Sequence, residues 1–173
     1  IDASLMPSFA DHDRDGDLDL FVLTYRYYRP GGRPAKRPIV MRNGRPKILP
    51  GFEKYYDLRR VGPSDWTVDT CGRPDRLFRN DGTGHFTDVS ENAGFTEKGH
   101  GLSATWWDHD GDGWLDLYVA NDFTDPEHLY HNNGDGTFTD VIEQAMPYTS
   151  WSSMGADCAD LNNDGLLDLF VAG

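Results

Sequence analysis

The stretch Asp108-His-Asp-Gly-Asp-Gly-Trp-Leu-Asp116 decides the fold, because the chain contains three loops of this design. The other two copies occupy residues 11–19 and 160–168. Each copy has oxygen-bearing side chains at positions 1, 3, 5 and 9 and a glycine at position 6. So many carboxylates within nine residues repel one another unless a cation lies among them. A hard cation that accepts many oxygen ligands in a tolerant geometry fits best, so the pattern predicts calcium.

The same spacing predicts which atoms bind the ion. Position 12, where an EF-hand carries a bidentate glutamate, is a valine in all three copies, so we expect the aspartate at position 9 to close the site. Position 7 varies freely in type, and we expect it to contribute its backbone carbonyl. One such stretch alone is typical of a solvated turn, but three in one register favour about three calcium ions, one per loop. The predicted ligands are Asp11, Asp13, Asp15, Asp17, Asp19, Asp108, Asp110, Asp112, Trp114, Asp116, Asp160, Asn162, Asp164, Leu166 and Asp168.

The loops belong to a longer repeat. The second and third loops start 52 residues apart, and the same spacing relates DRLFRNDGTGHFTDVSENA at 75–93 to EHLYHNNGDGTFTDVIEQA at 127–145. A period of about 50 residues is typical of a propeller or another repeated array.

One repeat reads as four short strands. Residues 102–107 enter a loop and 115–120 leave it with alternating apolar side chains. Residues 128–131 then precede Asn133-Gly134-Asp135-Gly136, a hairpin signal, and 137–141 form the last strand. Two such hairpins make one four-stranded antiparallel blade, so we expect an all-β partial β-propeller with the calcium loops between strands 1 and 2 of each blade. Only 88–93 and 140–145 are expected to form single helical turns.

The spacing also divides the chain. We expect blade 1 at residues 1–95, blade 2 at 96–147 and the first half of blade 3 at 148–173. A propeller needs four to eight blades to close, so we expect the chain to be a fragment of a larger propeller.

These motifs resemble a known family. The DxDxDGxxD loop with its following strand, and the L-[FY]-x-N-x-G-x-G-x-F-T-D-V stretch, resemble the FG-GAP/VCBS repeat, the calcium-binding blade of integrin alpha subunits and many secreted bacterial proteins. The variant NNGDGTFTDV is similar to the ASPIC/UnbV-associated, cartilage acidic protein-like group. The resemblance covers residues 1–23 and 75–173. In the integrin propellers the calcium loops occupy one face and ligand binds the opposite one, which implies a ligand face opposite the loops here.

Residues 25–74 are an insertion unlike the repeats. Thirteen of the 16 lysines and arginines fall between residues 24 and 76, against five acidic residues, although the whole chain carries a net charge of −13. The prolines argue against a regular helix, and five tyrosines add aromatic surface; the prolines are Pro30, Pro34, Pro38, Pro46, Pro50 and Pro63. Because the insertion joins strands 2 and 3, we expect it on the face opposite the calcium loops. It either covers the acidic surface of the propeller or binds a protein or an acidic polysaccharide. Nucleic acid is not expected, because the chain is acidic overall.

An enzymatic function is less expected than a binding or adhesion scaffold. No nucleophile motif, P-loop or zinc pattern is present in the sequence. His12 and His109 are expected to point to solvent, and His100 to stand alone. The alternative is a carbohydrate-active enzyme similar to propeller polysaccharide lyases, with the insertion forming the substrate site. Cys71 and Cys158 either pair or stay free.

We expect the protein at the cell surface, in the periplasm or outside the cell, since weak calcium sites need millimolar calcium. No apolar run in the sequence reaches the roughly 18 residues that span a membrane.

Overall fold

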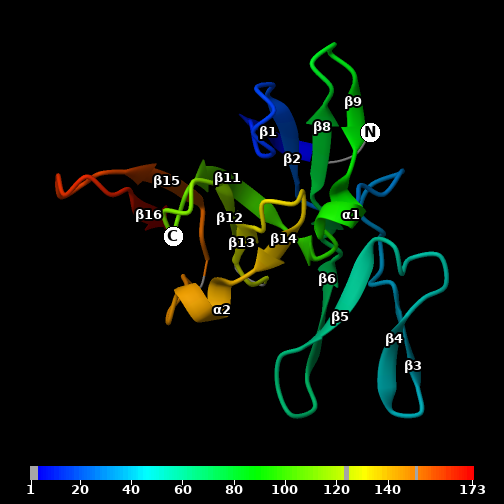
Figure 1. Cartoon of the computed structure of the whole chain (residues 1–173). Helices are drawn as coiled ribbons and strands as arrows, with labels where there is room; N and C mark the ends of the chain where they lie inside the picture. Colours follow the sequence, from blue (N-terminus) through cyan, green and yellow to red (C-terminus); the bar gives the residue numbers. More distant parts are fainter. Residues whose placement is uncertain (1–3, 123–124, 151) are drawn as a thin grey trace.

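The computed structural model describes residues 4–122, 125–150 and 152–173, and it confirms an all-β partial propeller. Two four-stranded antiparallel sheets, with orders β1-β2-β8-β9 and β11-β12-β13-β14, form two blades, and a two-stranded sheet follows them (Figure 1). The blade strands are β1 (Ser4–Ala10), β2 (Asp19–Thr24), β8 (Arg76–Asn80), β9 (Phe86–Asp88), β11 (Gly101–Trp107), β12 (Asp116–Asn121), β13 (His128–Asn132), β14 (Phe138–Asp140), β15 (Gly155–Ala159) and β16 (Asp168–Ala172). The boundaries 1–95, 96–147 and 148–173 stay a prediction.

The three acidic loops close in the same register. The residue before each loop pairs with the aspartate at position 9: Ala10 with Asp19, Trp107 with Asp116, and Ala159 with Asp168. The predicted strand–loop–strand hairpins are therefore present in all three repeats. The two predicted helical turns are present too, as α1 (Ser90–Ala93) and α2 (Ile142–Ala145).

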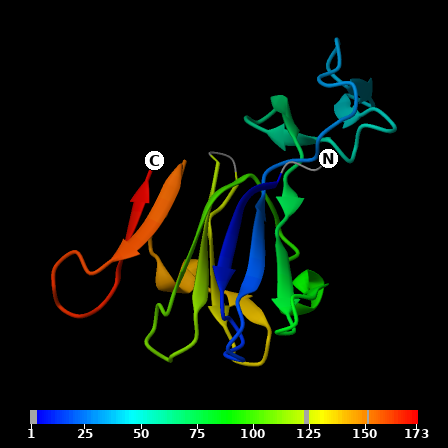
Figure 2. The same ribbon diagram turned by 90° about the horizontal axis from the view of Figure 1, so that it is seen from above.

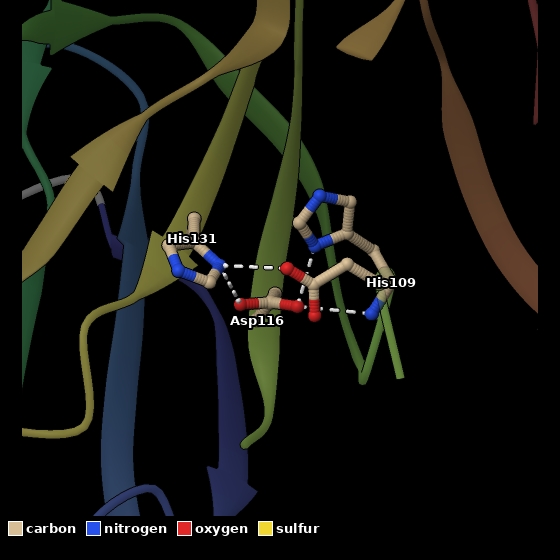
Figure 3. Close-up of side chains that lie close together, drawn as sticks. His109, Asp116 and His131 are labelled. Atoms are coloured by element: carbon tan, nitrogen blue, oxygen red, sulfur yellow. Dashed lines mark hydrogen bonds and ion pairs between the residues drawn. The ribbon is translucent and has the colours of Figure 1, made fainter. Parts of the chain in front are cut away.

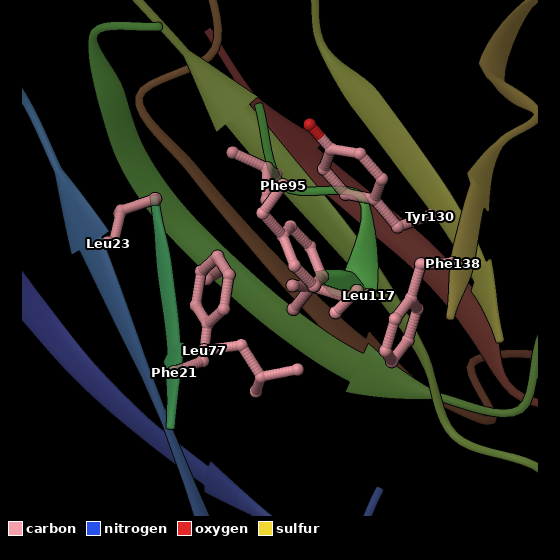
Figure 4. Packing of buried hydrophobic residues seen from close by; sticks show 10 residues of the cluster. Phe21, Leu23, Leu77, Phe95, Leu117, Tyr130 and Phe138 are labelled. Atoms are coloured by element: carbon pink, nitrogen blue, oxygen red, sulfur yellow. The ribbon is translucent and has the colours of Figure 1, made fainter. Parts of the chain in front are cut away.

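The main core lies between the first two blades. Phe95, which is only 2% exposed, has its ring centroid 5.4 Å from that of Phe21, 4.8 Å from that of Tyr130 and 5.1 Å from that of Phe138 (Figure 4). This residue follows α1, so the chain that leaves the first blade seals the contact with the second. A second apolar cluster, which includes Trp107, packs between the second blade and the β15–β16 hairpin.

The insertion leaves the first sheet intact, because β2 pairs directly with β8. It lies at the end of the strands opposite the acidic loops, as the order of the strands requires (Figure 2). The insertion itself contains two hairpins, β3 (Ile39–Arg42) with β4 (Arg45–Ile48) and β5 (Tyr56–Arg60) with β6 (Trp66–Thr70). Its last strand, β7 (Arg73–Pro74), pairs with β10 (Lys98–Gly99), which lies outside the insertion.

The two hairpins of the insertion were not among the strands predicted from the sequence. Asn43 and Gly44, both with positive φ (50° and 74°), form the turn between β3 and β4. An Asn-Gly pair is a strong hairpin signal, so the β3–β4 hairpin was readable from the sequence.

Candidate metal centre

Backbone N–H groups position the carboxylates in all three loops by the same hydrogen bonds. The glycine at position 6 donates to Oδ2 of position 1, at 3.1 Å in the first loop and 2.9 Å in the other two. The N–H of position 5 donates to Oδ1 of position 3, and the N–H of position 7 donates to Oδ1 of position 5. Each loop therefore folds around its own acidic side chains.

Left-handed backbone at two positions makes this folding possible. The glycines at position 6 have φ of 98°, 93° and 88°, a region that side chains with a Cβ rarely adopt. Position 4 is left-handed as well, at Arg14 (60°), Gly111 (78°) and Asn163 (62°). The invariant glycine at position 6 is thus a requirement of the loop's geometry.

The first three predicted ligands converge in the first two loops. Oxygens of Asp11, Asp13 and Asp15 lie within 4.8 Å of one another, and so do oxygens of the group formed by residues 108, 110 and 112. Asp11 Oδ1 is buried and has no hydrogen-bond partner in the described part of the chain. The third loop shares the hydrogen bonds, with Asn162 supplying an amide oxygen at position 3. An orphaned oxygen beside other oxygens fits a hard cation such as calcium.

Mutual repulsion is visible in the first loop. The pKa of Asp13 is raised above its usual value of 3.8, first by burial and then by the negative charges of Asp19 and Asp15. A divalent cation at this position would offset that repulsion.

The aspartate at position 9 ties each loop to its blade. Asp116 is fully buried; its Oδ2 accepts from the backbone N–H of His109 at 2.9 Å, and its Oδ1 from the backbone N–H of Asn132 at 2.7 Å. Asp19 accepts in the same way from His12 and Asn80. Both aspartates fall into a group with the residues at positions 2 and 3 and not with positions 1 and 5, so their ligand role stays a prediction, as does that of the carbonyl at position 7.

Two histidines expected in solvent are instead packed against these aspartates. His12 is 2% exposed, and its Nδ1 lies 2.5 Å from Asp19 Oδ2. His109 Nδ1 lies 2.6 Å from Asp116 Oδ2 (Figure 3). The expectation was wrong because the loop folds position 2 back over the end of the strand, where the ring reinforces the backbone contact to position 9. The repeated pairing of histidine with an aspartate seven residues later was the available signal.

A third histidine, expected to stand alone, lies in a polar cluster at the opposite end of the blades. His100 Nδ1 is 2.5 Å from Asp125 Oδ2, and its Nε2 is 3.0 Å from Thr70 Oγ1 of the insertion. Tyr25 contacts the His100 ring edge-on at 5.0 Å and donates to Asp122 Oδ2 at 2.9 Å. This cluster joins the insertion to the second blade.

The insertion also forms a hollow of about 450 Å³ beside this cluster. Five tyrosines and three arginines dominate its lining, which consists of Tyr25, Arg26, Tyr27, Tyr28, Arg29, Gly32, Arg33, Tyr55, Tyr56, Val68, Asp69 and Thr70. Both cysteines, Cys71 in the insertion and Cys158 on β15, are free thiols, so they do not pair.

Among the described residues, no helix is long and apolar enough to cross a membrane.

Comparison with known proteins agrees with the repeat. The sequence profile of the FG-GAP-like repeat matches residues 66–119 and 108–171. Cartilage acidic protein 1 of Xenopus tropicalis is 30% identical over 132 residues, which make up 69% of this chain and 20% of that protein. The chain thus spans about a fifth of the length of this curated relative. With the profile covering more than half of the sequence and the loops repeating in structure, the chain belongs to the FG-GAP-like repeat family.

Proposed function

We propose that this chain is a calcium-stabilised propeller segment of an extracellular, periplasmic or cell-surface protein, where it serves as a binding scaffold. The observation that supports calcium binding is the repeated loop geometry, with the same hydrogen bonds in all three loops and convergent oxygens of positions 1, 3 and 5 in the first two. Calcium locks the hairpin ends and offsets carboxylate repulsion, so its role is structural.

The test is a calcium titration by calorimetry, paired with melting curves in calcium and in chelator. Saturation at about three ions per chain, with a clear rise in melting temperature, is the expected result. Absence of calcium binding at millimolar concentration, in protein that the chelator melt shows to be folded, would refute the proposal.

We further propose that the ligand of the scaffold is an acidic polysaccharide that binds the insertion. Cations of the insertion lie over aromatic rings: Arg29 over Phe52 at 4.9 Å, Lys54 over Tyr27 at 5.0 Å, and Arg26 over Tyr25 at 5.5 Å. Within the described residues, no ion pair joins Arg26, Arg29 or Arg33 to a carboxylate, which leaves these cations available to an anionic ligand. Arginine and tyrosine are the side chains most enriched at binding hot spots, and arginine matches carboxylate and sulfate groups in shape and charge.

Binding of heparin and alginate, compared with neutral dextran, tests this second part. Arg29→Ala and Arg33→Ala are expected to weaken retention, whereas Arg79→Ala, on blade strand β8, should leave it unchanged. If heparin and alginate retain all three variants equally, the insertion is not the polysaccharide-binding site. A protein ligand would then be the better hypothesis.

An enzymatic role is the second candidate, because a histidine, two aspartates and a tyrosine gather beside the hollow. A lyase that uses Tyr25 as its base would need a lowered pKa, but burial and the hydrogen bond to Asp122 raise the pKa of this phenol. The arrangement therefore favours binding over catalysis. Polysaccharide turnover that is lost in Tyr25→Phe would reverse this preference.

A further inference from the structure

The two hairpins of the insertion, β3–β4 and β5–β6, project from the blades side by side. Strands β4 and β5 contact each other, and Figure 1 shows the turns of both hairpins at the ends farthest from the blades. The insertion lies at the end of the strands opposite the acidic loops (Figure 2). The residues that flank the two turns are therefore the outermost part of the face opposite those loops.

The first hairpin ends in two arginines that face each other. Arg42 and Arg45 are cross-strand partners beside the turn, and both side chains are exposed. Like charges directly opposite each other on a hairpin are destabilising. Residues 39–48 include a further cation, Lys47, and no acidic residue, and no carboxylate of the described ranges forms an ion pair with any of the three. A bound anion would offset this repulsion.

Exposed apolar side chains lie beside the cations at both turns. Met41, the last residue but one of β3, is 62% exposed. At the second turn, Val61 is 59% and Trp66 is 41% exposed. The guanidinium of Arg60 donates to two backbone carbonyls of this turn, which holds a positive charge over it as well. Each hairpin thus ends in large apolar side chains next to arginine.

A membrane surface that contains anionic lipids fits this combination. Its negative potential attracts lysine and arginine, and tryptophan is enriched at the headgroup level, where its ring is partly apolar and its N–H is wet. Apolar side chains among such cations are stabilised when they leave water for the boundary of the acyl chains. A hydrated polysaccharide would leave them in water, and a protein interface needs a contiguous area of about 800 Å² on each partner.

We propose that the turns of the β3–β4 and β5–β6 hairpins dock in the headgroup layer of an anionic membrane. The arginines of both turns contact lipid phosphates, and Met41, Val61 and Trp66 enter the layer between them. The acidic loops then face away from the membrane, which limits repulsion between their carboxylates and the lipid. Docking by the turns goes beyond the proposed binding of a polysaccharide by the hollow and does not depend on it.

Flotation with lipid vesicles in calcium-containing buffer tests the charged part of the surface. The parent is expected to float with phosphatidylcholine vesicles that contain phosphatidylglycerol, to float less as salt is added, and not to float with phosphatidylcholine alone. Arg45→Glu should lower the partition coefficient roughly fivefold or more. The matched control is the same charge reversal at Arg79, an exposed residue of β8, which should lower it much less.

The apolar part is tested by a second pair of variants and by fluorescence. Met41→Ser should weaken flotation, whereas Met154→Ser should not, because Met154 is equally exposed (63%) but precedes β15. Lipids with brominated acyl chains should quench tryptophan fluorescence in the parent but not in Trp66→Phe, since bromine quenches only rings that have entered the layer.

Melting curves in calcium establish that the variants are folded. Equal flotation of the parent and Arg45→Glu would overturn the proposal, because calcium bridges from the acidic loops to the lipid would then explain the binding. Folded parent protein that fails to float at low salt would overturn it too, as would equal quenching of the parent and Trp66→Phe. If the parent does not float and Arg45→Glu loses retention on heparin, the turns belong to a polysaccharide site and the membrane proposal is wrong.

Discussion

The side-chain amide of Asn132, on β13 of the second blade, donates a 2.8 Å hydrogen bond to the backbone carbonyl of His12, in the acidic loop of the first blade. Asn132 is 1% exposed, and the same amide also donates to the carbonyl of Leu115, within its own blade. One buried side chain thus holds the loops of two blades together. The predicted metal sites of the first and second loops are therefore joined through this side chain.

Replacing Asn132 by alanine is expected to destabilise both blades. The change leaves the buried carbonyl of His12 and the half-buried carbonyl of Leu115 without this donor, which corresponds to a loss of about 2–3 kcal/mol in the free energy of unfolding. Among the described residues, the side-chain amide of its counterpart Asn80 donates to Leu18 alone, inside the first blade, and lies nearer to solvent. Chemical denaturation should accordingly show a smaller loss in the free energy of unfolding for Asn80→Ala than for Asn132→Ala. An equal loss would mean that the hydrogen bond from Asn132 to His12 does not contribute to stability.

Removing a ligand of the third loop should lower stability only when calcium is present. With a dissociation constant near 10⁻⁴ M and about 10⁻³ M free calcium, one site adds roughly 1.4 kcal/mol. Asp160→Ala is expected to lose that amount in calcium and little in chelator. The control is Glu143→Ala, an exposed acidic residue of α2. Melting losses for Asp160→Ala of the same size in calcium and in chelator would argue that this aspartate acts only through its hydrogen bonds to the loop.

The carboxyl of Asp75 is expected to make stability depend on pH. Burial raises its pKa from 3.8 to about 6, although hydrogen bonds from Thr24 act in the opposite direction. Because the folded pKa is the higher one, the contribution of this group is fully present below about pH 4 and is lost as the pH rises through about 6.

Asp75→Asn removes that ionisation and retains an acceptor for the N–H of Thr24. Unfolding should require up to about 3 kcal/mol more free energy at neutral pH, and the pH dependence between about 4 and 6 should flatten. Glu91→Gln, an exposed carboxyl of α1, is the control. If the stability of Asp75→Asn falls with rising pH as steeply as that of the parent, the pH dependence arises from a group other than Asp75.

Phe95 is expected to be the most sensitive apolar position between the first two blades. Truncation to alanine removes a ring that contacts Phe21, Tyr130 and Phe138, at a cost of about 3–5 kcal/mol. Phe86 of β9 is 37% exposed, so Phe86→Ala should cost much less. If Phe95→Ala and Phe86→Ala shift the midpoint of urea unfolding equally, Phe95 does not lie in the main core between the first two blades.

Tyr25 is expected to anchor the insertion to the second blade. Tyr25→Phe deletes the donor to Asp122 and should speed tryptic cleavage within the arginine-rich insertion, with little change in melting temperature. The matched control is Tyr28→Phe, because the Tyr28 side chain is 61% exposed. Identical cleavage rates for the parent and both variants would exclude this anchor.

The sequence by itself determined the local part of this protein. Strand limits, the three acidic loops, the 52-residue period and the face from which the insertion emerges all follow from spacing, because a hairpin is built from backbone hydrogen bonds between residues close in sequence. The Asn43-Gly44 turn belonged to the same readable class and was overlooked.

Only the tertiary structure decided which side chains meet across blades. The burial of His12, the bond from Asn132 to its carbonyl and the place of Phe95 between two sheets involve residues from different repeats. The contact of His131 Nδ1 with the Asp116 carboxylate depends likewise on how β13 lies against β12. Periodicity fixes the direction of a side chain relative to its own strand, but burial and pairing depend on the surface that another strand or blade presents to it.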